Sequence, residues 1–402
     1  MSDTASLDLD VCIIGAGPNG GTLACILAEA GIRTAVLDQA ALAPMEHADF
    51  DGRAYAIAAG PQKVLERAGL WERLPIKPGP ITGIRVSDGK VGKRASPLFL
   101  HFDSEEAGAG PFGWMVEARS LRMALNARLA SLEALHVIAP ATASVERFAD
   151  HAVVQVAGGP RITCKLVVAA EGRRSPLRAQ AGIQTTSLPY GQSGIVFAMG
   201  HELPHHGTAL EHFLPGGPFA QLPLAPSEVA EHASAIVWTE KTAIAERLMQ
   251  VDDESFLREL RRRIGTHLGE VRLLGRRWCY PLSALLVHRY TDTRLALRGD
   301  AAHGVHPIAG QGLNLGFRDV NLLADLILEG GDPGDTETLA RYQAVRRPDN
   351  LTMLAATDVL DRLFSNDIGP IRLARDVGIA AVHRLPGLKR MFMRQAMGAL
   401  MA

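Results

Sequence analysis

The chain has 402 residues, of which 47% are hydrophobic and 21% are charged, and its formal net charge is -1 at pH 7. This composition is that of a globular protein, and the length predicts two lobes or one large α/β unit rather than one small core. The balanced charge and the aromatic content of only 5% argue against a nucleic-acid-binding surface.

The cysteines and the N-terminal residues predict a cytoplasmic protein. The four cysteines lie far apart and form no CxxC pair, so we expect free thiols, no metal site and no disulfide framework. The first ten residues, MSDTASLDLD, are acidic and lack the basic and apolar regions of a secretory signal. No run of 18 or more apolar residues predicts a membrane-spanning helix.

A strand, a glycine-rich turn and a helix open the chain. Residues 10–15 read DVCIIG, a β-branched apolar run that is typical of a buried parallel strand. A helix is predicted over 21–30, and a second strand over 34–37 ends at Asp38. The turn before the helix has a GxGxxG pattern formed by Gly15, Gly17 and Gly20. Asp38 lies 18 residues beyond the third glycine, near the spacing of about 20 seen in dinucleotide-binding units.

This unit predicts a Rossmann-like site for a dinucleotide. Gly15 permits the tight turn, Gly17 lets the backbone approach a pyrophosphate, and Gly20 lets the helix pack close to the strand. The free N–H groups and the positive dipole end of the helix favour the phosphates. Asp38 can accept hydrogen bonds from a ribose. The motif by itself does not separate FAD from NAD.

Two distant segments favour a flavin. Residues 166–178, LVVAAEGRRSPLR, contain a buried strand that ends in an acid and a glycine. Residues 295–314, LALRGDAAHGVHPIAGQGLN, contain a strand that ends at Gly299 and Asp300, a loop, and the start of a helix that extends to about Leu328. An acid at that strand end can bond the ribityl hydroxyls of a flavin.

The start of that last helix adds an anion-favouring site. The helix opens at Gly310, and the N–H groups of Gly312, Leu313 and Asn314 are not used by the first helical turn. Such a start suits a reduced flavin, because the N1/O2 edge of its ring carries negative charge.

These motifs together resemble class A flavoprotein monooxygenases of the para-hydroxybenzoate hydroxylase type, and more narrowly the UbiH/UbiF-type hydroxylases of ubiquinone biosynthesis. The resemblance covers nearly the whole chain. Beyond the glycine motif it is carried by residues 51–58 (DGRAYAIA), 117–125, 213–224 (FLPGGPFAQLPL), 237–238, 280–282 and 295–323. Asp38 stands where this family more often has Glu, and Glu171 stands where the class usually has Asp.

The resemblance implies an α/β fold, which becomes α+β when the whole chain is considered. We expect an FAD-binding, Rossmann-like domain with a parallel sheet, an interleaved substrate domain with a mainly antiparallel sheet, and a helical C-terminal region. The expected limits are 1–186 and 287–330 for the FAD-binding domain and 187–286 for the substrate domain. Further substrate-domain strands are expected near 75–115, and the helical region is expected over 331–402.

The resemblance also implies the reaction, that of a 2-polyprenylphenol hydroxylase. NAD(P)H reduces FAD, and the reduced flavin and O2 insert one oxygen atom into a prenylated phenol or quinone precursor of ubiquinone. Arg53 and Arg119 are assigned to the flavin or its pyrophosphate. His306, Pro307 and Gln311 are assigned as catalytic residues in the loop at the reactive edge of the flavin. Within this loop we expect His303 and His306 to brace the backbone by hydrogen bonds rather than to act as acids or bases.

The middle of the chain bears on the substrate. Its predicted strands place apolar side chains inward, which suits a prenylated ring better than a small charged acid. These inward residues include Val196, Phe213, Phe219 and Leu222.

The last residues bear on location. Residues 371–402 carry six Lys or Arg and one acid among apolar residues, which predicts a basic amphipathic helix. That helix either binds the inner face of the membrane or a partner in a ubiquinone-biosynthesis complex, or packs on the body of the protein.

Three alternatives to this function stay open. A flavoenzyme of this kind could reduce prenyl double bonds or hydroxylate another phenolic compound. A protein of a different class would use the FAD fold without turnover, as an escort for a prenyl lipid. A purified yellow protein that bleaches with NAD(P)H would distinguish an enzyme from an escort.

Overall fold

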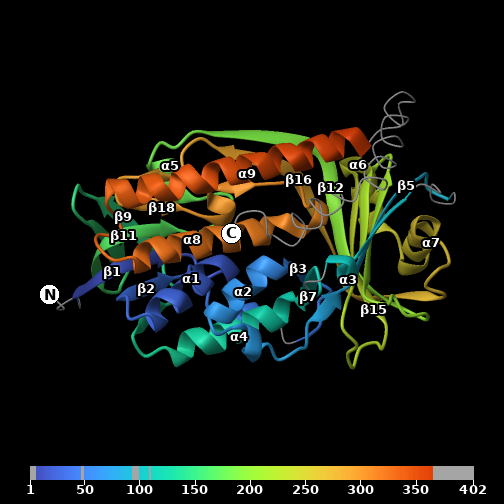
Figure 1. Ribbon diagram of the computed structural model, residues 1–402, viewed down its shortest axis with the longest axis horizontal. Helices are drawn as coiled ribbons and strands as arrows, with labels where there is room; N and C mark the ends of the chain where they lie inside the picture. The colour runs from blue at the N-terminus through green and yellow to red at the C-terminus, as the bar shows by residue number, and fades with distance from the viewer. Residues whose placement is uncertain (1–5, 47–48, 93–98, 108–109, 365–402) are drawn as a thin grey trace.

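Two eight-stranded sheets organise the computed structural model, which describes residues 6–46, 49–92, 99–107 and 110–364. The basic segment 371–402 lies outside the described residues. Figure 1 shows one sheet and most of the helices along the long axis of the molecule, and the second sheet standing across the other end.

The first sheet is parallel at its centre. Its strands are β1 (Ser6–Ile14), β2 (Thr34–Leu37), β8 (Leu135–Ile138), β9 (Ala143–Arg147), β10 (Ala152–Val156), β11 (Arg161–Ala169), β17 (Thr291–Asp292) and β18 (Leu295–Leu297). Their order is β17-β18-β11-β1-β2-β8, with β10 beside β11 and β9 beside β10. The run from β18 to β8 is parallel. Val11, Cys12 and Ile13 are fully buried, since protein packs on both faces of β1.

The register aligns the carboxyl ends of four strands. Ile14 of β1 pairs with Leu37 of β2 and with Ala169 of β11, and Ala169 also pairs with Leu297 of β18. The turns that follow these strands therefore open at one edge of the sheet, which is where open parallel sheets bind ligands.

Helices cover this sheet and carry its connections. They are α1 (Pro18–Glu29), α2 (Ala59–Arg67), α4 (Ala118–Ser131), α5 (Pro176–Gln180), α8 (Gln311–Leu328) and α9 (Thr336–Phe364). α1 packs against α4 and α8, and α9 packs on α8 (Figure 1). α1 begins at Pro18, three residues before the predicted start, because the fixed φ of proline suits the first helical position.

The second sheet is mainly antiparallel. Its strands are β5 (Gly83–Asp88), β6 (Phe99–Asp103), β12 (Thr185–His201), β13 (Thr208–Leu214), β14 (Gly217–Pro223), β15 (Ala233–Lys241), β16 (Val271–Val287) and β19 (His303–Gly304). Their order is β19-β16-β12-β15-β14-β13-β5-β6. Within the described part of this sheet, β13 and β5 form the only parallel pair, and the other neighbouring strands are antiparallel.

Two helices close one face of this second sheet. They are α6 (Thr242–Gln250) and α7 (Asp253–Ile264). Phe256 and Leu260 of α7 pack in one buried cluster with Phe197 and Trp238 of the sheet. α7 ends at Ile264, and the residue after it, Gly265, takes a φ of 72°. The opposite face of the sheet is left to meet the first lobe.

A small antiparallel sheet joins the two lobes. It consists of β3 (Ala54–Ala58), β4 (Gly79–Ile81) and β7 (Gly113–Glu117), and the short helix α3 (Ser104–Ala107) precedes β7. Ile81 and Met115 of this sheet share a buried cluster with Ala198 and Leu274 of the large antiparallel sheet. The lobes are thus held together by apolar packing.

The predicted fold class is confirmed: a parallel sheet with helices and a mainly antiparallel sheet are built from interleaved segments. β5 and β6, which fall near 75–115, belong to the antiparallel sheet. The limits of the two domains stay a prediction. Among the described helices, none is long and apolar enough to cross a membrane.

Candidate active site

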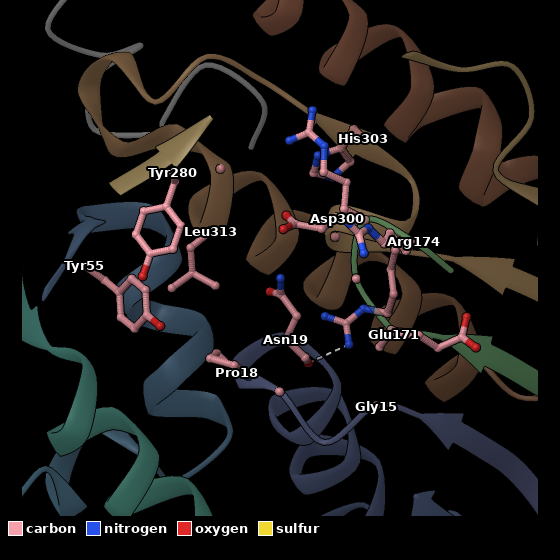
Figure 2. A pocket seen from close by; sticks show the side chains of 18 of the residues that line it. Gly15, Pro18, Asn19, Tyr55, Glu171, Arg174, Tyr280, Asp300, His303 and Leu313 are labelled. Atoms are coloured by element: carbon pink, nitrogen blue, oxygen red, sulfur yellow. Dashed lines mark hydrogen bonds between the residues drawn. The ribbon is translucent and has the colours of Figure 1, made fainter. Parts of the chain in front are cut away.

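A cavity of about 1160 Å³ extends between the two large sheets. One end lies at the aligned turns after β1, β2, β11 and β18, and the other end lies against β12, β13, β14 and β15. In Figure 2, Asp300 and His303 lie above Pro18 and Asn19, and Tyr55 and Tyr280 lie at the left of the view. The cavity is large enough for a dinucleotide and a substrate side by side.

The glycine turn is shaped by backbone contacts. Gly15 has a φ of 109°, and a Cβ there would lie 2.4 Å from the carbonyl oxygen of Ala170. A Cβ on Gly20 would lie 1.8 Å from the carbonyl oxygen of Gly15. A Cβ on Gly17 would meet no described atom within 4 Å, and this residue lines the cavity. Gly15 and Gly20 are therefore required by the fold, whereas Gly17 leaves open space in the cavity.

The helix that follows the turn offers an anion site. α1 begins without a side chain that caps its N-terminal N–H groups, and Gly17 is its N-cap. Pro18 at the first helical position and Asn19 next to it line the cavity. The positive end of the α1 dipole therefore faces the cavity.

Asp38 lies beside this turn on the cavity wall. Its Oδ2 accepts a hydrogen bond of 2.8 Å from the N–H of Ala16, and its Oδ1 accepts one of 2.9 Å from the N–H of Ala40. Both bonds fix the orientation of the carboxylate at the end of β2. The carboxylate is therefore presented at the place where a ribose is expected.

The Gly299–Asp300 turn is held from behind by Asp319. The Oδ2 of Asp319 accepts hydrogen bonds from the N–H of Gly299 (2.9 Å) and from Nε2 of His303 (2.8 Å), and its Oδ1 accepts one from Nε of Arg346 (2.7 Å). Burial opposes ionisation of Asp319, but His303 and Arg346 outweigh it and hold its pKa well below the usual range. Asp300 and His303 both line the cavity. The partner of His303 is thus a carboxylate, where the sequence predicted the backbone.

The start of α8 forms another part of the wall. Gly310 has a φ of 62° and is the N-cap of this helix, and Gly312 and Leu313 line the cavity. Asn314 points away from it: its Oδ1 accepts from the N–H of Ala58 (3.0 Å), and its Nδ2 donates to the carbonyl oxygen of Ala56 (2.9 Å). Asn314 therefore ties the helix start to β3.

The predicted residues divide into two groups in the structure. The cavity wall contains Gly15, Gly17, Asp38, Gly299, Asp300, Pro307, Gly310, Gly312 and Leu313. It does not contain Gly20, Arg53, Arg119, His306, Gln311 or Asn314, among the residues that the structure describes. The roles that the resemblance assigns to the members of both groups remain predictions.

The two predicted arginines bind neighbouring carboxylates. Arg53 forms an ion pair of 2.6 Å with Asp51 and lies over the ring of Trp278. Arg119 forms one of 2.7 Å with Glu117. Neither arginine lines the cavity.

His306 lies behind the loop that Pro307 forms. It is fully buried, and neither ring nitrogen has a hydrogen-bond partner in the described part of the chain. Its Nε2 is 3.7 Å from the carboxylate of Asp361, and its ring packs edge-on against Tyr190. Packing rather than a hydrogen bond to the backbone therefore holds His306.

Arg298 is a cavity residue that the motifs did not single out. It follows β18, and its side chain is fully buried, with Nη1 donating to the carbonyl oxygen of Asn19 at 2.5 Å (the dashed line in Figure 2). Its Nε and Nη2 have no partner among the described atoms. Burial lowers the pKa of Arg298 to about 10. A signal was present in the sequence, because an arginine interrupts the apolar run LALRG.

These features fit a bound diphosphate. A buried guanidinium with unsatisfied donors, an uncapped helix N-terminus and open space above Gly17 meet at one end of the cavity. An anion would pair with the free donors of the guanidinium and with the N–H groups of the helix, and the space above Gly17 is wide enough to admit it. The donor set therefore agrees with a dinucleotide cofactor such as FAD.

Comparisons with known proteins identify the family. The FAD-binding domain family matches residues 8–357. Ubiquinone hydroxylase UbiL of Rhodospirillum rubrum is 49% identical over 100% of this chain and 92% of its own length. The 3-demethoxyubiquinol 3-hydroxylase of Escherichia coli is 30% identical over 97% of this chain and 98% of its own length.

A solved structure agrees in fold. The crystal structure of p-nitrophenol 4-monooxygenase PnpA from Pseudomonas putida superposes with a TM-score of 0.76 at 17% identity, over 99% of this chain and 100% of that chain. FAD is the cofactor of the family, and NAD(P)H is the co-substrate typical of its monooxygenases. The chain belongs to the FAD-binding domain family and is an FAD-dependent monooxygenase of the group that contains the ubiquinone hydroxylases.

Proposed function

We propose that this monooxygenase inserts one oxygen atom into the ring of a prenylated phenol or quinone precursor during ubiquinone biosynthesis. The named activities of its relatives from Rhodospirillum rubrum and Escherichia coli support this substrate class. The observation that carries the proposal is the continuity of one cavity, which extends from the glycine turn to an apolar wall of the antiparallel sheet.

The wall at the substrate end is mostly apolar. Val196, Leu222, Val237 and Leu282 line it, and they suit an uncharged ring with an aliphatic chain. Two of the residues expected there lie elsewhere.

Phe219 is buried in the cluster under α6 and α7, and Phe213 packs against Phe364 of α9. The strand alternation turns Phe219 to the opposite face of the sheet, because Ala220 faces the cavity.

The chain's own residues bind and orient, and bound FAD supplies the redox chemistry with NAD(P)H and O2. We assign the diphosphate to the N-terminus of α1 and to Arg298, and the ribose to Asp38. Asp300 is assigned to the ribityl hydroxyls. The N-terminus of α8, at Gly312 and Leu313, faces the cavity and favours negative charge there.

The loop before α8 completes the proposed site. Pro307 lies on the cavity wall, and we assign it to the reactive edge of the flavin. His306 and Gln311 are buried next to it and are assigned to holding the loop from behind. This arrangement requires no strong protein base, because the substrate phenol activates its own ring.

The basic segment 371–402 is assigned to the inner membrane surface, where a prenylated substrate resides. Deletion of residues 385–402 should weaken sedimentation of the protein with anionic liposomes. Equal sedimentation of the truncated and full chains would contradict this assignment.

The reaction is tested with the purified yellow protein in air. NADH or NADPH oxidation is followed with and without a 2-polyprenylphenol, and the products are analysed by mass spectrometry. We expect the phenol to stimulate oxidation and to gain one oxygen atom. Flavin reduction without an oxygenated product, for every phenol and quinol tested, would contradict the proposed substrate class.

A further inference from the structure

One acidic side chain interrupts the apolar wall of the cavity. Glu211 of β13 lines the cavity on the face of the antiparallel sheet that looks toward the first lobe. Among the cavity-lining residues contributed by strands β12 to β15, Glu211 is the only carboxylate in the described part of the chain. Neither the family motifs nor the proposed cofactor contacts account for it.

Glu211 begins a row of residues that are paired across four strands. It pairs with Ala220, Ala220 pairs with Val237, and Val237 pairs with Val196. All four residues line the cavity. Since neighbouring strands lie about 4.8 Å apart, the row extends roughly 14 Å from the carboxyl group across an apolar floor. That length accommodates a ring and the first part of an aliphatic substituent.

The same strand reaches the loop at the proposed reactive edge. Phe213, two residues beyond Glu211 on the same face of β13, shares a buried cluster with Ile308. Ile308 directly follows Pro307, which lines the cavity. Glu211 therefore lies at the end of the row that is nearest to this loop.

The carboxyl group of Glu211 has no partner of its own. No hydrogen bond or ion pair joins it to any described residue, and the side chain is partly open to the cavity. Burial without a compensating partner raises its pKa to about 7. A buried acid without a partner is costly, so a hydrogen-bonding group of a ligand is its expected complement.

We propose that Glu211 binds the ring hydroxyl of the substrate, and that it thereby fixes which ring carbon faces the reactive edge of the flavin. This inference rests on the proposed function and names the contact that recognises the phenol. The hydroxyl donates its hydrogen to a carboxylate oxygen, and the prenyl chain lies along the row from Ala220 to Val196. This hydrogen bond polarises the O–H bond of the phenol and raises the electron density on its ring. The ring then attacks an electrophilic oxygen atom more readily.

The test compares two ligands that differ only in the hydroxyl group: 2-geranylphenol and geranylbenzene. Their affinities for the FAD-loaded enzyme are measured by the change in the flavin absorption spectrum. The wild-type enzyme should bind the phenol about 10- to 100-fold more tightly, as expected for a hydrogen bond to a charged group. In Glu211→Leu the ratio of the two dissociation constants should fall to about 1, because the hydrogen bond that distinguishes the phenol has been removed.

A matched variant at the other end of the row serves as the control. Val196→Ala removes apolar contact without changing a polar group, so it should weaken both ligands by a similar factor and keep the preference for the phenol. The FAD content of each variant reports whether it has folded. If Glu211→Leu does not retain FAD, the isosteric Glu211→Gln decides, and its preference should fall at least threefold, because a neutral acceptor forms a weaker bond.

The outcomes separate this inference from the proposed function. A wild-type enzyme that binds neither compound, with NAD(P)H oxidation unaffected, contradicts the substrate class and the Glu211 contact with it. A wild-type enzyme that binds both compounds equally overturns the Glu211 contact alone. The contact is also overturned if an FAD-loaded Glu211 variant keeps the wild-type preference for the phenol.

Discussion

Replacement of Arg298 by methionine should have opposite effects on the apoprotein and on cofactor binding. The guanidinium is fully buried, and Nε and Nη2 have no partner among the described atoms. Without an anion, the fold therefore bears an unpaired charge, and with one, the same donors form charge-assisted bonds. Methionine keeps the length and the apolar stem and removes the charge.

The expected size of both effects follows from the burial. The pKa of about 10 for Arg298 corresponds to a penalty of about 3 kcal/mol against the charged form, at 1.36 kcal/mol per pKa unit. Because the folded and unfolded pKa values both lie above neutrality, the penalty is fully present at pH 7. Arg298→Met should thus stabilise the apoprotein by up to about 3 kcal/mol, and should weaken FAD binding about 10- to 100-fold through loss of a charged hydrogen bond.

Two measurements test this pair of effects. Urea unfolding of the apoprotein gives its stability, and flavin fluorescence on titration gives the dissociation constant for FAD. Arg341→Met, in an exposed ion pair with Glu329, is the control and should change neither quantity appreciably. If Arg298→Met destabilises the apoprotein and leaves the FAD dissociation constant within twofold of the wild-type value, Arg298 is a structural group and the reasoning is wrong.

Three further predictions follow from the same cavity. Gly17→Val should lower the free energy of unfolding by less than about 1 kcal/mol, because a Cβ added at this position meets no described atom within 4 Å. The same side chain fills the space above the turn, so titration should show FAD binding weakened at least about tenfold. Asp319→Asn should lower the free energy of unfolding in urea by about 3 kcal/mol at pH 7, because it breaks a buried ion pair. The difference in stability between variant and wild type should narrow below about pH 4, where protonation of Asp319 begins to remove the stabilisation that its carboxylate gives the wild-type protein. The stability of Glu211→Gln relative to the wild type should rise by up to about 3 kcal/mol between about pH 4.3 and pH 7. In that range the carboxyl group of Glu211 ionises in the unfolded wild-type chain but stays protonated in the folded one, which favours unfolding of the wild type. Urea unfolding of both proteins at pH 5 and pH 8 measures this change.

The parts of the site that sequence reasoning located are those that local geometry determines. Gly15 and Asp38 each follow a strand directly, Asp300 lies three residues beyond the end of β18, and parallel pairing aligns the ends of those strands at one edge. The strand–turn–helix pattern determines both the backbone conformation and the place in the fold. The start of α8 was located for the same reason, because Gly310 must adopt a positive φ.

Residues whose direction depends on distant packing were not located in this way. Arg53 and Arg119 occur in segments that resemble flavin contacts, yet each binds a carboxylate two residues away. Phe213 and Phe219 were expected at the substrate, but α9 and the helices behind the sheet cover them. For Phe219, strand alternation decides which face of the sheet the side chain takes, and an apolar sequence does not reveal that face.

Arg298 and Glu211 show what a polar side chain without a partner on a cavity wall signifies. Arg298 directly follows the apolar strand β18 and Glu211 lies within β13, and the structure places both on the cavity wall with polar atoms that no described residue satisfies. The cost of burying such a group is recovered only when a ligand supplies the opposite charge or hydrogen-bonding partner. One of them lies at the cofactor end and the other at the substrate end, so the same physical rule that locates the diphosphate also locates the phenol hydroxyl.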